Sequence, residues 1–135
     1  MPSRRDPAPA RIKRYRRGRI AELVAAALLM AKGYRILARR WRSPYGEIDL
    51  IARRGRRLAF VEVKRRPSRA EAEAAITPHQ SGRYARAAEF WVSRYPAFAE
   101  HEWALDIVFV TPGKFPVHIE HGLQPAGGAK RPGAR

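Results

Sequence analysis

Apolar and polar residues follow one another along this chain in patterns that predict both helices and strands. From Gly18 to Lys32 the apolar residues recur every three or four positions and Gly33 follows them, which predicts a helix buried on most of its sides. The stripe expected to be buried comprises Ile20, Leu23, Val24, Ala27, Leu28 and Ala31, widened by Leu29 and Met30. Residues 34–41 alternate as a strand does, and residues 43–46 (SPYG) are typical of a turn.

Residues 46–66, GEIDLIARRGRRLAFVEVKRR, predict a β-hairpin. One strand begins at Glu47, and the return strand runs from Leu58 to about Lys64. The loop between them contains Gly55, which adopts positive φ without strain and so permits a tight reversal. Charges within such apolar strands must face water, pair with one another or hold a cation, because an unpaired buried charge is costly.

The second half of the chain carries two helix-capping patterns and two further strands. Residues 68–71 (SRAE) predict a cap before a short alanine-rich helix. Residues 77–80 (TPHQ) predict a second cap, with proline at the first helical position, before a helix that reaches about Tyr95. Residues 104–110 (ALDIVFV) predict a strongly apolar strand, and residues 115–120 a weaker one. The expected order is therefore α, β, β, β, α, β, with one trailing strand.

The length of 135 residues suits one domain, expected over residues 16–122. Residues 1–15 and 123–135 are basic and rich in proline, with glycine in the second segment, so both are expected to be disordered tails. The absence of cysteine excludes disulfides, thiolate nucleophiles and cysteine zinc sites. No run approaches the roughly 18 apolar residues that a membrane span requires, so a cytoplasmic location is expected.

The charge balance indicates what the domain binds. Lysine and arginine number 28 against 12 acidic residues, a formal net charge of +16, and such a surface attracts polyanions. Nucleic acid is the expected partner. A membrane surface is the competing polyanion, but the most apolar helical segment lacks the basic polar face that a membrane-surface helix carries, so no membrane partner is expected.

Acidic residues of the hairpin are expected to converge. Glu62 and Lys64 are two apart and share a face of their strand, and a turn centred near Gly55 sets Asp49 roughly opposite Glu62. Two carboxylates close together repel each other unless a cation neutralises them, and hard oxygen ligands suit Mg²⁺ or Mn²⁺. The alternative is an ordinary cross-strand charge cluster on a solvated face. Phe60, which shares the face of Glu62, argues against that alternative, because a solvated face seldom carries a large aromatic residue.

The combination of GEIDL, a short loop and FVEVK resembles the PD-(D/E)xK superfamily of restriction-endonuclease-like nucleases. More closely, the chain is similar to the YraN-like family of bacterial proteins over about residues 18–110. The resemblance implies an α/β protein with a restriction-endonuclease-like αβββαβ core, in which helices flank a mixed central sheet. The sequence departs from the superfamily pattern at Ile48, which stands where proline usually precedes the aspartate.

The same resemblance implies roles for four residues. Asp49 and Glu62 correspond to the acids that bind Mg²⁺ or Mn²⁺, and Lys64 corresponds to the catalytic lysine. Glu22, on the first helix, corresponds to the additional catalytic and metal-binding acid of family members and of archaeal Holliday-junction resolvases. For Glu22 there is an alternative, because an acid near the first turn of a helix is stabilised by the helix dipole without any catalytic purpose.

Other polar residues receive weaker interpretations. Gln80 and Tyr84 echo a Gln-x-x-x-Tyr signature of exonuclease branches, but Gln80 also completes the capping box that Thr77 begins, and the cap is favoured. His79 stands where family members often carry lysine. Asp106 is expected to close a structural hydrogen-bond network rather than to bind metal. No function is assigned to the histidines that lack a ligand pattern, which are His101, His118 and His121.

Arginines flank the hairpin acids in the sequence, and Trp41 and Tyr45 are interleaved with them. Arginine and aromatic residues together serve phosphate backbones and unstacked bases. The arginines expected to contact nucleic acid are Arg53, Arg54, Arg56, Arg57, Arg65 and Arg66. The alternative is a solvated basic face with Trp41 in the core, which is the favoured interpretation for Trp41 itself.

The sequence thus predicts a metal-dependent nuclease that hydrolyses phosphodiester bonds of nucleic acid, with DNA foremost. The alternative, from another class, is a non-catalytic nucleic-acid-binding module on the same fold. Asp49, Glu62 and Lys64 favour the enzyme, because a module that only bound the backbone would gain nothing from acids that repel phosphate. The oligomeric state stays open, although cleavage of a junction would suggest a two-fold homodimer.

Overall fold

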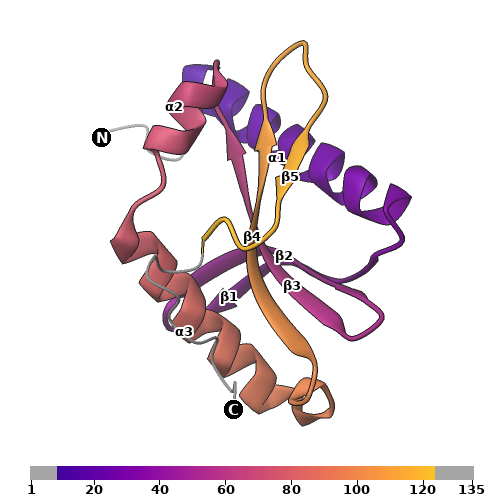
Figure 1. The fold of residues 1–135 in the computed structure, drawn as a ribbon. Coiled ribbons are helices and arrows are strands. Elements are labelled where there is room, and N and C mark those ends of the chain that lie inside the picture. Colours follow the sequence, from indigo (N-terminus) through magenta and orange to yellow (C-terminus); the bar gives the residue numbers. More distant parts are fainter. Residues whose placement is uncertain (1–8, 124–135) are drawn as a thin grey trace.

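The computed structural model describes residues 9–123, which form a five-stranded sheet with helices on both faces (Figure 1). The helices are α1 (Pro9–Ala31), α2 (Arg69–Ala74) and α3 (Pro78–Arg94), followed by the short 3-10 helix η1 (Pro96–Phe98). The strands are β1 (Arg35–Ser43), β2 (Gly46–Arg54), β3 (Arg57–Arg65), β4 (Glu102–Val110) and β5 (Val117–Ile119). No helix within residues 9–123 is long and apolar enough to cross a membrane.

The sheet order is β1-β2-β3-β4-β5. Strands β3 and β4 are parallel, and every other neighbouring pair is antiparallel. Helices α2 and α3 together form the crossover that a parallel pair requires. This arrangement confirms the expected αβββαβ core with a mixed sheet and a trailing strand.

Local sequence signals are confirmed at the hairpin turn and at two helix caps. Gly55, in the turn between β2 and β3, has a φ of 59°. The Ser68 side chain accepts a hydrogen bond from the Glu71 N–H at 3.2 Å, and Thr77 accepts one from the Gln80 N–H at 3.1 Å. These caps satisfy backbone donors that the first turn of each helix leaves unpaired.

The boundaries at the two ends differ from the expectation. Helix α1 begins at Pro9, so the segment 1–15 that was expected to be disordered is helical from that residue. Arginine and lysine are good helix formers, and a helix nucleated by its packed part extends into them. At the other end Leu123 is completely buried and its N–H donates to the Leu105 carbonyl at 3.1 Å, so it belongs to the domain and not to the tail. Residues 1–8 and 124–135 of the two expected tails lie outside the described residues.

Helix α1 packs on the sheet through small side chains. Ala25 and Leu29 are completely buried, whereas Ile20, Leu23 and Met30 are each more than half exposed. The expectation that this helix is buried on most sides was therefore wrong. Apolar residues form two neighbouring stripes on α1, and the alanine stripe lies inward because it lets the helix axis approach the strands closely.

Two buried clusters lie on opposite faces of the sheet. The larger joins the strands to α3, where Phe60 and Trp91 meet with ring centroids 5.8 Å apart. The smaller joins the strands to α1. Ile48 belongs to the first cluster and Leu50 to the second, although residues two apart on a regular strand share a face. The alternation of β2 therefore breaks between them, at Asp49.

Asp106, on β4, is fully buried among hydrogen-bond donors. It accepts two bonds from Arg57 (2.6 and 3.0 Å), one from His118 Nε2 (2.8 Å) and one from the His121 N–H (2.9 Å). Lys32 Nζ lies 2.6 Å from His118 Nδ1, and because lysine only donates, Nδ1 accepts and Nε2 carries the proton. Burial raises the pKa of Asp106, but the bonds from His118 and Arg57 lower it to about 2.

This network confirms the structural role expected of Asp106. It also corrects the expectation for Arg57, whose side chain is only 14% exposed and is committed to Asp106 rather than presented to a phosphate backbone. Its position in the arginine-rich loop gave no sign of this, because the partner lies far along the chain on β4.

Candidate active site

Strands β2 and β3 separate at one end of their pairing, and the candidate catalytic acids lie where they part. The last regular pair in that direction is Leu50 with Val61. Beyond it, the Tyr84 hydroxyl accepts a bond from the Asp49 N–H and donates one to the Val61 carbonyl, each at 2.9 Å. The Asp49 carboxylate accepts from the Val63 N–H at 2.8 Å. Side chains thus satisfy backbone groups that the sheet no longer pairs, and they hold the strands apart.

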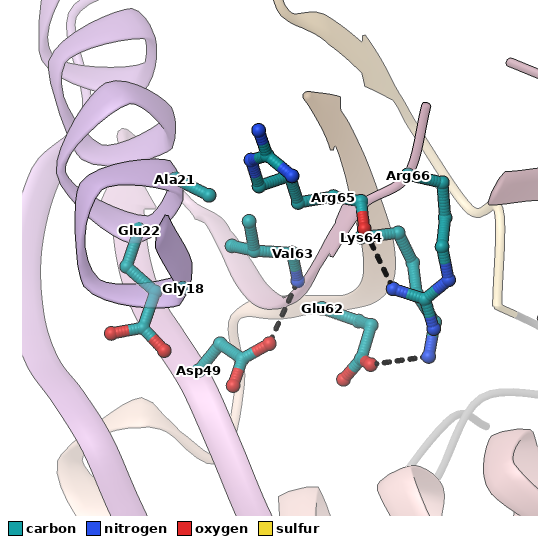
Figure 2. Close-up of a pocket in the computed structure, with 9 residues that line it drawn as sticks. All are labelled: Gly18, Ala21, Glu22, Asp49, Glu62, Val63, Lys64, Arg65 and Arg66. Atoms are coloured by element: carbon teal, nitrogen blue, oxygen red, sulfur yellow. Dashed lines mark hydrogen bonds and ion pairs between the residues drawn. The ribbon is translucent and has the colours of Figure 1, made fainter. Parts of the chain in front are cut away.

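Asp49 and Glu62 approach each other in this gap, as the hairpin register predicted (Figure 2). Burial raises the pKa of Asp49, the charge of Glu62 adds to that rise, and the bond from Val63 only partly opposes them, so the pKa is about 8. Lys64 Nζ lies 2.9 Å from Glu62 Oε2, and these two side chains are only 9% and 12% exposed respectively. They do not lie on a solvated face, which removes the alternative of an ordinary surface charge cluster.

Gln80, on α3, is a site residue that the capping interpretation missed. Its N–H is capped by Thr77, but its side-chain Nε2 donates to Glu62 Oε2 at 3.0 Å instead of completing the capping box. Its Oε1 is buried and has no hydrogen-bond partner among the described residues. The Gln-x-x-x-Tyr spacing was the signal that could have found it, because residues four apart share a helix face and Tyr84 also reaches the acids.

Glu22, on α1, lines the same cleft and forms an ion pair with Arg40 at 3.5 Å. Burial raises the pKa of Glu22, and the charge of Arg40 opposes that rise. The helix-dipole alternative for Glu22 fails, because α1 begins at Pro9 and its first turn contains no acid. Within residues 9–123, no three His, Cys, Asp or Glu residues are grouped closely enough to hold one metal ion. Glu22 therefore does not join Asp49 and Glu62 in a three-residue metal site in this structure.

The donor set of Asp49 and Glu62 fits a hard divalent cation. Magnesium commonly takes one or two protein carboxylates and completes its shell with water and phosphate oxygens. The pKa of Asp49 is raised first by burial and then by the charge of Glu62, and two cations near these acids are already paired within the described residues, Lys64 with Glu62 and Arg40 with Glu22. A divalent cation between the two carboxylates would remove that repulsion.

These residues line a cleft of about 470 Å³ between the middle of α1 and the end of β3 (Figure 2). The lining residues are Gly18, Ala21, Glu22, Asp49, Glu62, Val63, Lys64, Arg65 and Arg66. Two of the six arginines expected to contact nucleic acid, Arg65 and Arg66, are therefore at the cleft.

The other arginines expected at the site lie at the opposite end of the hairpin. Arg53, Arg54 and Arg56 flank the turn at Gly55. Gly55 is six residues from Asp49 along the hairpin, which corresponds to roughly 20 Å at the rise per residue of a β-strand. Proximity in the sequence was misleading here, because an extended strand separates its two ends.

Comparisons with known proteins place this chain among close relatives. A family model described as uncharacterised protein family UPF0102 matches residues 21–110. A UPF0102 protein of Rhodopseudomonas palustris (strain BisB18) is 50% identical over 112 residues, which cover 83% of each chain. The UPF0102 protein mlr4633 of Mesorhizobium japonicum is 50% identical over 117 residues, covering 87% of this chain and 94% of the other. The UPF0102 protein bll0669 of Bradyrhizobium diazoefficiens is 49% identical over 111 residues, covering 82% and 84%.

Proposed function

We propose that this chain, which belongs to the uncharacterised protein family UPF0102, is a metal-dependent nuclease that hydrolyses phosphodiester bonds of nucleic acid, DNA foremost. The membership confirms the resemblance to the YraN-like family. One observation carries the proposal. Asp49 and Glu62 meet in a cleft with Lys64, Arg65 and Arg66, and the pKa of Asp49 is raised to about 8 by burial and by Glu62. Strongly perturbed acids in a cleft are typical of catalytic sites.

The chain's own residues supply positioning and charge. Arg65 and Arg66 lie at the cleft, where guanidinium groups suit a phosphate backbone. The Glu62 carboxylate is held by Lys64 on one side and Gln80 on the other. Lys64 retains N–H groups beyond its bond to Glu62, and these would orient the attacking water or stabilise charge that develops on the phosphoryl oxygens.

Asp49 and Glu62 are the residues that would hold Mg²⁺ or Mn²⁺, with Glu22 in the wall of the same cleft. Such an ion, when bound, polarises a phosphoryl oxygen and lowers the pKa of water. The alternative, a non-catalytic nucleic-acid-binding module, does not explain these acids, since carboxylates beside a phosphate weaken binding to the nucleic-acid backbone.

The test is incubation with labelled single-stranded, duplex, flap and four-way DNA, and with RNA, in magnesium, manganese or chelator. We expect cleavage only with a divalent cation. Asp49→Asn should abolish cleavage, because an amide cannot supply the carboxylate that a divalent cation needs, while folding and nucleic-acid affinity are retained, because the substitution adds no negative charge beside the phosphate. Lys64→Met should lower kcat by roughly 100- to 1000-fold, the usual effect of losing one donor to a developing oxyanion, with a smaller change in KM.

The matched controls are Glu89→Gln and Lys114→Met, which remove exposed charges outside the cleft. Both should behave as the wild type. Full activity of purified Asp49→Asn would contradict the catalytic assignment, and equal losses of rate and binding in Lys64→Met would make Lys64 a backbone contact.

A further inference from the structure

A second cavity, of about 230 Å³, adjoins the candidate active site and shares Asp49 and Glu62 with it. Its other walls come from Tyr45 in the turn between β1 and β2, from Gly46 and Glu47 at the start of β2, and from α3, none of which lines the first cleft. The Glu47 carboxylate is paired with Arg42 at 3.6 Å. Because the same two acids border both cavities, a polymer that crosses the acids from the first cleft enters the second.

The second cavity presents an aromatic ring and a cation. Tyr45 is 42% exposed, and Phe90 contacts its ring edge-on, with centroids 6.0 Å apart and an interplanar angle of 68°. Arg83 lines the cavity from α3, is exposed, and makes no ion pair with another described residue. Its guanidinium carbon lies 3.9 Å from the position that a Cβ on Gly46 would occupy, so it lies beside the turn that carries Tyr45. An aromatic ring beside a free guanidinium suits a base and its phosphate.

An unsatisfied acceptor lies in the wall of the same cavity. Gln80 lines it, and the Oε1 atom of Gln80 is buried without a hydrogen-bond partner in the described part of the chain. The Nε2 of the same amide is fixed by Glu62, which only accepts when ionised, so the orientation of the amide is set. A buried acceptor without a donor is costly, and an amino or hydroxyl group of a bound nucleotide would satisfy it.

We propose that this second cavity binds a nucleotide that flanks the scissile phosphate, with its base stacked on Tyr45 and a phosphate paired with Arg83. The inference rests on the proposed nuclease function and narrows its substrate. A base inside a duplex is already stacked on both faces, so only an unpaired base can stack on Tyr45. The substrate is therefore single-stranded at the site, as in a single strand, a flap or a frayed end.

The first test measures binding, in chelator, of a short labelled oligonucleotide as a single strand and as a blunt duplex. Tyr45→Ala should weaken single-strand binding roughly 5- to 100-fold, the usual range for losing one stacked base, and leave duplex binding unchanged. Tyr45→Phe, which keeps the ring, should bind as the wild type does. Phe115→Ala is the matched control, because Phe115 is 92% exposed and lines neither cavity.

A second pair of variants tests the cation. Arg83→Ala should weaken single-strand binding and make it less sensitive to salt. Arg86→Ala is the control, because Arg86 lies one turn along the same helix and does not line this cavity. The inference would be overturned if Tyr45→Ala bound the single strand as well as Phe115→Ala does. It would also be overturned if Tyr45→Ala lost equal affinity for the single strand and for the duplex.

Cleavage assays separate this inference from the proposed function. If the wild type cleaves nucleic acid but Tyr45→Ala retains full single-strand binding, the second cavity fails as a nucleotide site while the nuclease stands. If Tyr45 governs single-strand binding but no metal supports cleavage by the wild type, the nucleotide site stands and the nuclease fails.

Discussion

Asp49 is held where its own charge is disfavoured. Its carboxyl is buried beside Glu62, yet its acceptor bond to Val63 keeps it in that position. An arrangement of this kind lowers the stability of the folded chain and is retained where a ligand or a reaction needs it. Because only the charged form of Asp49 is disfavoured, the stability of the folded chain should depend on pH.

The free energy of unfolding should fall as pH rises from 3.8 to about 8 when divalent cations are absent. The unfolded chain releases the Asp49 proton near the ordinary pKa of 3.8, whereas the folded chain keeps it until about pH 8, so the folded state binds more protons between these values. Asp49→Asn should lack this contribution and should unfold at a higher denaturant concentration than the wild type at pH 8. Chemical denaturation across this pH range in chelator measures the difference.

Glu89→Gln is the control for that experiment, and magnesium should raise the midpoint of the wild type more than that of Asp49→Asn. Parallel pH curves for the wild type and Asp49→Asn would show that the Asp49 carboxyl titrates normally in the folded chain.

Pairwise geometry decided which site residues the sequence could predict. Asp49 and Glu62 were found because a hairpin turn fixes which residues face each other, and Lys64 because a strand repeats every two residues. The side-chain contacts of Gln80 and Arg57 were missed, since each residue has a local interpretation, a helix cap and a basic loop, while the partner of its side chain comes from a distant segment. No local pattern encodes a partner chosen by tertiary packing.

At the scale of elements, the turn and cap signals predicted where helices and strands occur, but not which side of α1 faces inward. Ala25 is completely buried and Leu23 is about half exposed, although both belong to apolar stripes with helical spacing. Periodicity reports that a helix is amphipathic, whereas the buried side is selected by the fit between the helix and the strands.

Replacing Ala25 by a larger residue should therefore destabilise the fold, whereas shortening Leu23 should not. Ala25→Leu should lower the free energy of unfolding by about 1–3 kcal/mol, because the helix would have to move off the sheet. Leu23→Ala should change it by less than about 0.5 kcal/mol, as is usual for an exposed position. Urea denaturation of both variants measures the contrast. A larger loss in Leu23→Ala would mean that the exposed stripe is covered by another molecule in solution.

At the scale of the whole molecule, the basic charge is spread well beyond the cleft. The chain carries a formal charge of +16, and Arg53 and Arg54, four and five residues from Asp49 on β2, lie roughly 13–17 Å from it along the strand. Two separated basic regions give a long nucleic acid more phosphate contacts than a short one.

Arg53→Ala combined with Arg54→Ala should weaken binding of long DNA without weakening that of a short single strand. On long duplex DNA, the slope of log affinity against log salt should become shallower by up to about two units, at roughly 0.9 per phosphate contact. Different sequences should be affected alike, because backbone contacts carry no sequence information. Titrations over a range of salt with long and short DNA measure both effects. A loss confined to one sequence, or an equal loss on the short strand, would contradict this assignment of the turn arginines.

The parallel pairing of β4 with β3 has a consequence for how the protein is made. The strands that carry Asp49 and Glu62 leave the ribosome before α2, α3 and β4. However, β4 supplies Leu105 to the cluster under α3 and Val108 to the cluster under α1, so neither core closes until it has been synthesised. Long-range pairing of this kind is slow to form, because the loop between the strands must close before the contacts are made. A nascent chain interrupted before residue 102 would contain both acids without the packed sheet that brings them together, so the site forms only after β4 has been synthesised.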